Sequence, residues 1–448
     1  MINNHRSSLK EVRLNKKLEG KIKSHTATVG IIGMGYVGLP LAVELGNQNF
    51  NVIGIDINPK KVSILSSGKS DIDDISDQQV RVLVKAKKLR CTADFSALTK
   101  CDVVPICVPT PLNKTKDPDV SFILSATHEI RKYLHPGQLV ILESTTYPGT
   151  TEELLRPILE STGLKVGKDF FLAFSPERVD PGNTRFGTKN TPRVVGGTTP
   201  TCNRLAKFFY EQIINRVIPL SSTQSAEMVK LLENTFRSVN IGLVNEVALM
   251  CDKLGINVWE IIEAADSKPF GFMKFYPGPG LGGHCIPIDP HYLSWKLKAL
   301  NYYARFIELA GDVNSHMPEY VVHRVNRVLN QKGKNLCSSN ILILGAAYKK
   351  DIKDLRESPA LDVIRLFQKE GAHVKYSDPH VPSIDMDTYI MRSVKLTPQL
   401  LAKSDCVVVV TDHTAYDYEW VVRHSQMVFD TRNATRNVRT NRKKIFTL

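Results

Sequence analysis

One cysteine ends a run of glycines and prolines in the second half of the chain. Residues 277–290 have the sequence PGPGLGGHCIPIDP, which places Cys285 after the last glycine and Asp289 four residues later. Glycine and proline at this density are incompatible with a helix interior or a central strand, so the segment is predicted to be a loop whose backbone closely approaches another group. Such a loop could present a nucleophilic thiol to a substrate, or it could be a tight structural turn around a buried cysteine.

A helix predicted over residues 226–251 carries the next candidate groups. Lys230, Asn234 and Arg237 recur at i, i+4 and i+7 and therefore share one side of this helix. The helix is apolar over more than half of its circumference, which predicts that it is largely buried. Hydrogen-bond donors and positive charge on a buried helix suit an anionic ligand or a developing oxyanion, although a solvated helix edge would show the same spacing.

A glycine motif near the N-terminus lies between two predicted strands. The motif Gly33–Gly38, GMGYVG, follows a strand over residues 28–32 and precedes a helix over residues 39–48 and a strand over residues 51–56. This order is typical of a dinucleotide-binding turn, where glycines permit the tight turn, the approach of a pyrophosphate and the packing of helix on strand. Asp56, 23 residues after Gly33, could accept a hydrogen bond from a ribose 2′-hydroxyl, which favours NAD over NADP.

Three further buried strands must position the groups around this motif. They are predicted over residues 102–108, 138–142 and 170–174, with helical sequence between them. With the first two strands they predict a doubly wound, parallel α/β sheet. Ligands bind such sheets at the carboxyl ends of the strands, so Thr110, Thr145 and Glu177, in the loops that follow these strands, are candidate site residues by position.

A second α/β unit is predicted after a linker at residues 331–339. Its strands are expected over residues 340–345, 373–378, 405–410 and 427–430, and a helix from His291 to about Asn314 precedes the linker. The turn after the first of these strands lacks the glycine triplet of a dinucleotide site. Cations near the strand ends could bind the phosphates of a different ligand or could simply be solvated. These cations are Lys349, Lys350, Lys353, Arg356 and Arg432.

Composition limits the classes of function. The chain has 448 residues, enough for more than one domain, and no apolar run approaches the roughly 20 residues of a membrane helix. Most of the net charge of +14 lies at the ends, where residues 1–28 carry seven Lys or Arg against two acids and residues 432–448 carry six against none. We therefore expect solvated basic tails, no nucleic-acid partner and no membrane partner. The eight cysteines form no CxxC pair and the polar N-terminus is unlike a secretory signal, which indicates a cytoplasmic protein without a zinc site.

In this order, the motifs resemble those of the UDP-glucose/GDP-mannose dehydrogenase family over roughly residues 27–440. The shared motifs are Gly33–Gly38, Ser144-Thr145, Ser175-Pro176-Glu177, Lys230 with Asn234, Gly282-Gly283-His284-Cys285 with Asp289, and Arg356-Glu357-Ser358-Pro359. Ile288 stands where the glucose branch usually has a lysine. The chain is therefore most similar to the branch that acts as UDP-N-acetylglucosamine 6-dehydrogenase in bacterial and archaeal surface-polysaccharide pathways, with UDP-N-acetylmannosamine and UDP-glucose as alternative substrates.

The resemblance implies an NAD-dependent, four-electron oxidation of the C6 hydroxyl of a UDP-N-acetylhexosamine to the uronic acid. Cys285 would add to the intermediate aldehyde as a thiohemiacetal, whose oxidation gives a thioester that water hydrolyses. Lys230 and Asn234 would stabilise the oxyanion, and Asp289 would transfer protons through a water positioned by Thr145. Glu177 would contact the sugar or act as the hydrolytic base. The glucose branch has a second carboxylate where this chain has Pro181, so the identity of that base stays open.

The resemblance also implies sets of binding residues, with no metal ligand among them. The implied cofactor-binding residues are Gly33, Met34, Gly35, Tyr36, Val37, Gly38, Asp56, Lys61, Pro109, Thr110, Ser144, Thr145 and Arg356. The implied substrate-binding residues are Glu177, Arg178, Lys230, Asn234, Arg237, Phe275, Pro277, Gly278, Gly282, Gly283, Lys349 and Arg432, of which the last two would meet the UDP moiety.

The predicted fold is α/β, with two Rossmann-like doubly wound domains joined by a central helical domain that contains a long helix. The expected boundaries are a basic tail over 1–26, an NAD-binding domain over 27–222, a central domain with the cysteine loop over 223–330, and a UDP-sugar-binding domain over 331–448. Members of the family are commonly dimers built on the long helix, so we expect a homodimer.

Two other functions share parts of this pattern. A two-electron β-hydroxyacid-type dehydrogenase would have the Rossmann-like and helical parts, but it needs neither the cysteine loop nor a second α/β domain. A non-catalytic NAD-binding regulator would leave Lys230, Asn234, Cys285 and Asp289 without a role.

Overall fold

The chain folds as two compact units in a computed structural model. The structure describes residues 2–72, 74–113, 117–180, 182–183 and 185–448, with the side chains of residues 2–12 left undescribed. One unit comprises Met1–Glu233 with His291–Leu300, and the other comprises Asn234–Pro290 with Asn301–Leu448. Within this described part of the chain, no helix combines the length and the apolar character needed to cross a bilayer.

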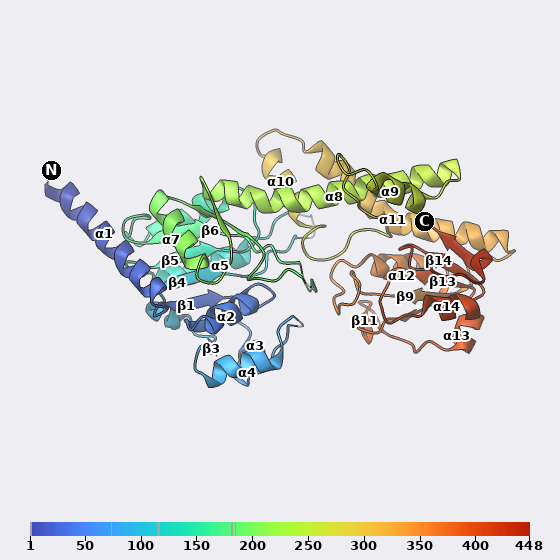
Figure 1. The fold of residues 1–448 in the computed structure, drawn as a ribbon, viewed down its shortest axis with the longest axis horizontal. Helices are drawn as coiled ribbons and strands as arrows, with labels where there is room; N and C mark the ends of the chain where they lie inside the picture. Colours follow the sequence, from blue (N-terminus) through green and yellow to red (C-terminus); the bar gives the residue numbers. More distant parts are fainter. Residues whose placement is uncertain (1, 73, 114–116, 181, 184) are drawn as a thin grey trace. The chain divides into compact units, whose positions relative to one another are not determined.

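The first unit is built on an eight-stranded sheet with strand order β3-β2-β1-β4-β5-β6-β7-β8. Figure 1 labels β1, β3, β4, β5 and β6 of this sheet. Its strands are β1 Thr28–Ile32, β2 Asn51–Ile55, β3 Leu89–Thr92, β4 Val103–Ile106, β5 Leu139–Leu142, β6 Phe171–Phe174, β7 Arg193–Gly197 and β8 Val217–Leu220. The strands pair in parallel except β6 with β7, which are antiparallel. The predicted doubly wound sheet is confirmed, and this one reversed pair was not predicted.

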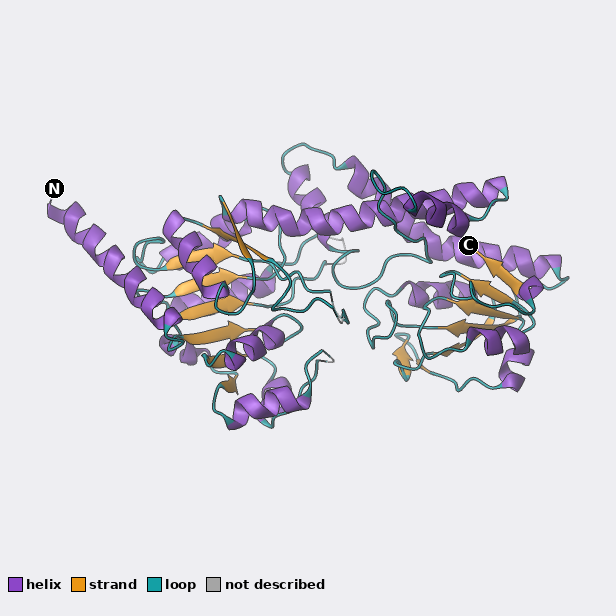
Figure 2. Cartoon of the chain, viewed as in Figure 1, coloured by secondary structure: helices purple, strands orange, loops and turns teal. Residues whose placement is uncertain are grey.

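Helices flank the sheet of the first unit (Figure 2). They are α1 Ile2–Lys23, α2 Gly38–Asn47, α3 Pro59–Ser66, α4 Asp77–Lys85, α5 Ser121–Tyr133, α6 Arg156–Glu160 and α7 Pro200–Tyr210, with shorter helical turns η1 Phe95–Lys100 and η2 Thr151–Leu155. Every residue of β4, β5 and β6 is buried. Continuous apolar strands of this kind are expected where helices cover both faces of a parallel sheet.

Four helices occupy the middle of the sequence. They are α8 Thr223–Leu254, α9 Val258–Asp266, α10 Asp289–Lys298 and α11 Arg305–Gln331. The long helix predicted over 226–251 corresponds to α8, which has 32 residues. The helix predicted from His291 to about Asn314 is wrong, because the chain leaves the helical conformation between α10 and α11. Asn301 has φ +56°, a left-handed conformation that ends a helix.

The second unit contains a five-stranded parallel sheet with order β10-β9-β13-β14-β15. Its strands are β9 Asn340–Leu344, β10 His373–Ser377, β13 Cys406–Val409, β14 Val428–Asp430 and β15 Ile445–Thr447, and β11 Ser383–Asp385 pairs separately with β12 Ile390–Arg392. The accompanying helices are α12 Pro359–Lys369, α13 Pro398–Lys403 and α14 Tyr418–His424, with a short turn η3 Arg442–Lys444. The predicted second α/β domain is therefore present.

Candidate functional site

The three glycines of the turn after β1 have different environments. Gly33 has φ +92°, and a Cβ at this position would lie 2.6 Å from the carbonyl oxygen of Cys107. A Cβ on Gly38, the first residue of α2, would lie 1.9 Å from the carbonyl oxygen of Gly33. A Cβ on Gly35 would have no described atom within 4 Å beyond its chain neighbours. Chain packing therefore requires the first and third glycines, whereas the backbone of the second is open to a ligand.

The N-terminus of α2 is suited to an anion. Val37 occupies the N-cap position and makes no capping hydrogen bond through its side chain. Within the first helical turn, the amides of Leu39 and Leu41 already donate to the carbonyls of Gly35 and Val37, at 3.0 Å and 3.3 Å, and Pro40 has no N–H group. The attraction for a bound phosphate therefore comes mainly from the helix dipole. Together with the open backbone at Gly35, this geometry fits the pyrophosphate of a dinucleotide.

Asp56 and Lys61 hold the backbone of Met34 within the same turn. Asp56, which follows β2, accepts hydrogen bonds from the amides of Met34 at 3.0 Å and Asn58 at 2.9 Å. Lys61 donates to the carbonyl of Met34 at 3.4 Å and forms an ion pair with Asp71 at 2.6 Å. The structure thus brings together three of the predicted cofactor-binding residues, and Asp56 lies at the strand end where a ribose is bound in dinucleotide folds.

The loops after β4 and β5 lie beside each other through side-chain hydrogen bonds. Ser144 donates to the carbonyl of Val108 at 2.7 Å, one residue before the exposed Pro109. Tyr292 donates to the carbonyl of Thr110 at 2.8 Å. Thr145 is half-buried next to Ser144. Lys296, one turn further along the same helix, forms an ion pair with Glu153 at 2.6 Å.

Glu177 is the centre of a polar network after β6. One of its carboxylate oxygens accepts from the amides of Arg178 at 2.7 Å and Val179 at 2.9 Å. Its backbone carbonyl accepts from the Nζ of Lys230 at 2.7 Å, and Lys230 is only 8% exposed. The side chain of Arg178 pairs with Glu233 on α8. These contacts bring the predicted residues Glu177, Arg178 and Lys230 into one cluster within the first unit.

A buried ion cluster that the sequence did not reveal supports Glu177. Arg193, the first residue of β7, is 4% exposed and donates to Glu143 and, at 3.4 Å, to the second carboxylate oxygen of Glu177. Its Nε donates to the hydroxyl of Ser175 at 2.9 Å, and Tyr210 donates to Glu143 at 2.5 Å. Burial raises the pKa of Glu143. Burial opposes the charge of Arg193, but the combined attraction of Glu143, Glu177 and the other acidic groups around it outweighs burial and raises the pKa of Arg193.

Glu227 is a second buried carboxylate that sequence reasoning missed. It is 0% exposed on α8 and accepts from the amides of Gly149 at 2.6 Å and Thr151 at 3.0 Å and from the hydroxyl of Thr151 at 2.6 Å. Burial raises the pKa of Glu227, and these hydrogen bonds oppose the shift. Glu227 therefore anchors the loop that carries Ser144 and Thr145 to the long helix.

In the second unit, Asn234, Cys285 and Asp289 are linked by hydrogen bonds. The amide nitrogen Nδ2 of Asn234 donates to a carboxylate oxygen of Asp289 at 2.5 Å, and both residues are buried, at 5% and 3% exposure. The backbone amide of Asp289 donates to the carbonyl of Cys285 at 2.8 Å, which forms the turn into α10. Cys285 itself is half-buried. The structure therefore places a fixed carboxylate one turn away from the cysteine.

The glycine-rich loop packs against the loops of the C-terminal sheet. The amide of Gly278 donates to Oδ1 of Asn245 at 2.9 Å, and a Cβ on Gly278 would lie 2.5 Å from Arg432. The amide of Gly283 donates to the carbonyl of Arg356 at 2.9 Å. Cβ atoms on Gly282 and Gly283 would lie 2.6 Å and 2.8 Å from Tyr348. Glycine is thus required by close approach, as predicted for a loop of this composition.

The remaining predicted residues have less specific environments. Phe275 makes an edge contact with Phe236, with ring centroids 5.9 Å apart. Pro277 is buried, Lys349 is half-buried, and Arg237 is exposed although Lys230 and Asn234 on the same helix are buried. Pro181, which bears on the hydrolytic base, lies outside the described residues.

The predicted cofactor residues fall in both units. Arg356 belongs to the second unit, and the other predicted cofactor residues belong to the first. The guanidinium of Arg356 forms a bidentate pair with Asp354, at 3.0 Å from Nε and 2.6 Å from a terminal nitrogen.

Comparison with known proteins covers nearly the whole chain. Residues 27–214 match the NAD binding domain of the UDP-glucose/GDP-mannose dehydrogenase family, residues 224–316 match its central domain, and residues 342–437 match its UDP binding domain. The chain is 35% identical to a UDP-N-acetyl-D-mannosamine dehydrogenase of Methanococcus maripaludis, over 90% of this chain and 92% of that protein. It is also 35% identical to a UDP-N-acetyl-D-glucosamine 6-dehydrogenase of Pseudomonas aeruginosa, over 87% and 88%.

The structural comparison agrees. The fold superposes on the UDP-D-ManNAc dehydrogenase of Pyrococcus horikoshii with a TM-score of 0.85 and 32% identity, over 94% of this chain and 98% of that chain. The NAD binding, central and UDP binding domains of the family thus match this chain in that order. The chain belongs to the UDP-glucose/GDP-mannose dehydrogenase family of NAD-dependent nucleotide-sugar dehydrogenases.

Proposed function

We propose that the protein oxidises the C6 hydroxyl of UDP-N-acetylglucosamine to the carboxylic acid, in two successive two-electron steps. The observation that carries this proposal is the hydrogen bond between the buried side chains of Asn234 and Asp289, because Asp289 lies four residues after Cys285. A two-electron dehydrogenase needs a base but no thiol. A carboxylate held beside a half-buried cysteine is what a second oxidation through a covalent intermediate requires.

The turn at Gly33–Gly38 with Asp56 would hold NAD, which supplies a hydride acceptor for each oxidation. The open backbone at Gly35 and the uncapped N-terminus of α2 support this assignment. Lys61, Pro109, Thr110, Ser144, Thr145 and Arg356 complete the proposed set of cofactor residues.

The side chains of the central region would handle protons and the thiol. Asp289, fixed by Asn234, accepts the hydroxyl proton through a water that Thr145 positions. The Cys285 thiolate then adds to the aldehyde carbon, and Lys230 and Asn234 stabilise the resulting oxyanion. After the second oxidation a water adds to the thioester and the Cys285 thiolate leaves.

Glu177 is the proposed base for that hydrolysis. Its carboxylate is held by the amides of Arg178 and Val179 and by Arg193, which keeps it oriented. A carboxylate fixed in this way could deprotonate water as it attacks the thioester.

The C-terminal sheet would bind the UDP moiety. Lys349 and Arg432 follow β9 and β14 at the carboxyl edge of a parallel sheet, where ligands of such folds bind. Arg432 is fixed by a hydrogen bond from its Nε to the carbonyl of Val410 at 2.9 Å and lies against Gly278 of the glycine-rich loop. Phe275, Pro277, Gly282 and Gly283 would line the sugar from the same loop.

We also propose a homodimer built on the central helices. Exposed apolar side chains on α8 and α11 support it, with Leu254 71% exposed, Phe306 75% and Leu309 57%. Such residues at a surface indicate an interface. Light scattering of the purified protein should give twice the chain mass, and a monomer would contradict the proposal. We further propose a cytoplasmic location, because none of the eight cysteines, all of which the structure describes, forms a disulfide bond.

A substrate panel tests the proposed function. UDP-N-acetylglucosamine, UDP-N-acetylmannosamine, UDP-N-acetylgalactosamine and UDP-glucose are supplied with NAD, and NADH formation is followed with identification of the product by mass spectrometry. The highest kcat/KM is expected for UDP-N-acetylglucosamine, because Ile288 matches that branch. A clear preference for UDP-N-acetylmannosamine would move the assignment to that branch, and no turnover with any of them would contradict the proposal.

A further inference from the structure

The loop after β9 is held at both ends by side chains from other loops of the second unit. At its start, the carboxylate of Asp378 accepts from the amides of Ala346 at 2.6 Å and Ala347 at 3.0 Å. At its end, the ring nitrogen Nδ1 of His413 accepts from the amide of Asp351 at 3.0 Å. Lys349 lies between these two attachment points.

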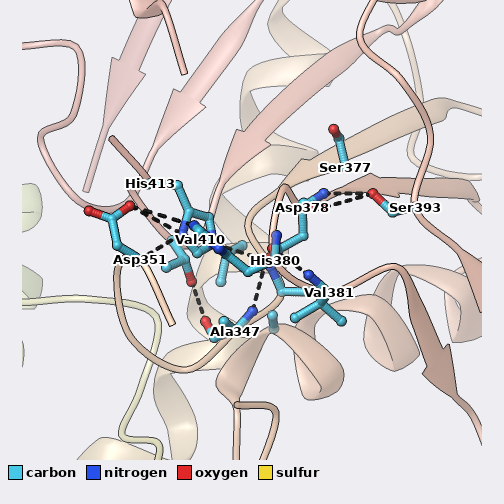
Figure 3. Close-up of polar contacts among 12 residues, drawn as sticks. Ala347, Asp351, Ser377, Asp378, His380, Val381, Ser393, Val410 and His413 are labelled. Atoms are coloured by element: carbon cyan, nitrogen blue, oxygen red, sulfur yellow. Dashed lines mark hydrogen bonds and ion pairs between the residues drawn. The ribbon is translucent and has the colours of Figure 1, made fainter. Parts of the chain in front are cut away.

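His413 and Asp378 are themselves joined (Figure 3). His413 is 0% exposed, and its Nε2 lies 2.9 Å from the carboxylate oxygen of Asp378 that binds the two alanine amides. Because the amide of Asp351 can only donate, Nδ1 carries a lone pair and the proton lies on Nε2. One histidine in one tautomer thus connects the two attachment points of the loop.

Asp378 is a firm anchor for this arrangement. Its second oxygen accepts from the amides of His380 at 2.7 Å and Val381 at 3.0 Å. Burial works against its charge, but the hydrogen bonds from His413 and the amides outweigh burial and lower the pKa of Asp378 to about 2. The carboxylate is therefore anionic at neutral pH and accepts all these bonds at once.

Further contacts tighten the same loop. The hydroxyl of Thr411 donates to the carbonyl of Ala347 at 2.6 Å, and the amide of Thr414 donates to the carboxylate of Asp351 at 2.8 Å. Asp351 has φ +60°, an unusual conformation for a residue other than glycine. Such a backbone persists only where surrounding contacts hold it.

A metal site is the alternative explanation of this cluster. Donor atoms of Asp351, His380 and His413 all lie within 4.8 Å of one another. However, the Nδ1 lone pair of His413 is already occupied by the amide of Asp351, and the Asp351 carboxylate accepts from Thr414. A metal ion would have to displace the hydrogen bond at Nδ1, so the geometry favours hydrogen bonding over metal binding.

We propose that His413, oriented by Asp378, is a positioning residue that fixes the 346–351 loop so that Lys349 is preorganised for the diphosphate of the nucleotide sugar. This inference rests on the proposed function, because it assigns the UDP moiety to the C-terminal sheet. A flexible loop would have to be ordered when the ligand binds, at the expense of affinity. The His413–Asp378 pair orders the loop beforehand.

The test is UDP binding by isothermal titration calorimetry, which needs no turnover. His413→Ala removes both hydrogen bonds and is expected to weaken UDP binding roughly tenfold. His413→Asn, which can keep an acceptor near the position of Nδ1, should bind more tightly than His413→Gln, which cannot. With the nucleotide-sugar substrate, the KM for the sugar should rise less in His413→Asn than in His413→Gln, whereas kcat and the KM for NAD should stay within about twofold of wild type. General damage to the fold would not produce this pattern.

His380→Ala is the matched control. It removes a ring from the same cluster but keeps the backbone amide that binds Asp378, so UDP affinity should stay within twofold of wild type. Should His413→Ala fail to fold, Thr411→Val tests the same loop with a residue of equal size, and weaker UDP binding is again expected.

Three results would overturn the inference. UDP affinity unchanged in the His413 variants, with wild type binding normally, would refute the positioning role and leave the proposed function intact. Equal losses in His380→Ala and His413→Ala, together with one zinc ion per chain bound in a zinc titration, would identify a metal site instead. Absence of UDP binding by the wild type would refute the proposed function as well.

Discussion

Replacing Arg193 with methionine should destabilise the first unit by about 3–5 kcal/mol. The guanidinium of Arg193 is the positive partner of Glu143, which is 1% exposed, and of Glu177. Without it, Glu143 would remain buried beside two uncharged donors, the hydroxyl of Tyr210 and the thiol of Cys107. An unpaired buried carboxylate must either stay charged in an apolar environment or take up a proton, and both cost stability.

A double replacement separates the charge effect from lost packing. Glu143→Gln combined with Arg193→Met leaves no buried charge in this pair, so the double variant should be more stable than Arg193→Met alone by about 1–3 kcal/mol. The comparison matters because the methionine side chain fills much of the space of arginine but cannot donate to Ser175 or Glu177.

Hydrogen exchange measured by mass spectrometry reports the effect locally. Peptides that cover β5 and β6 should exchange faster in Arg193→Met, whereas peptides that cover β9 and β13, in the other compact unit, should be unchanged and provide the internal control. An Arg193→Met variant as stable as wild type, or a double variant less stable than the single one, would refute the reasoning that the pair is a tightly coupled buried ion cluster.

Three further predictions follow from individual contacts. Gly35→Ala should leave the melting temperature unchanged, because the added Cβ meets no other atom within 4 Å, but it should raise the KM for NAD at least tenfold. Gly187→Ala, whose Cβ also meets open space, is the control and should leave both quantities unchanged. A loss of stability in Gly35→Ala would contradict the account. Glu227→Gln should lower the free energy of unfolding of the first unit by about 1–3 kcal/mol in a denaturant titration, because the buried carboxylate of Glu227 accepts three hydrogen bonds. Unchanged stability would show that other contacts hold the 149–151 loop. The pKa of Asp378 is lowered from 3.8 to about 2, so this carboxylate stabilises the folded state above pH 4 and loses that effect as the pH falls from about 4 to about 2. Hydrogen exchange of β9 should therefore show that the stability difference between wild type and Asp378→Asn shrinks by about 2 kcal/mol over this pH range. A constant difference would contradict the assignment.

The sequence predicted the elements with strong local signals. The turn at Gly33–Gly38, its flanking strands and the long helix α8 were found because glycine spacing and apolar periodicity are local properties. The break between α10 and α11 was missed, since it depends on a single left-handed residue, Asn301, within otherwise helical sequence. The reversed pairing of β6 and β7 was missed because strand direction leaves no trace in a short apolar segment.

The candidate site was predictable only where a motif carried it. Cys285, Asp289 and Asn234 were named from their motifs, and the structure adds the hydrogen bond between the last two. Arg193 and Glu143 lie 50 residues apart and belong to no motif. The sequence signal available for this pair was a charged residue next to an apolar strand. Exposed strand ends show the same signal, so it does not identify a buried ion pair. Their partnership arises from the tertiary fold.

The number of NADH molecules formed per sugar tests the central claim most directly. With limiting UDP-N-acetylglucosamine and excess NAD, the wild type should form two NADH per sugar and release the acid, because Cys285 permits the second oxidation. In Cys285→Ala no acid should form, and intact-protein mass spectrometry of the wild type during turnover should detect a sugar adduct on Cys285. One NADH per sugar with an aldehyde or ketone product from the wild type would contradict the account.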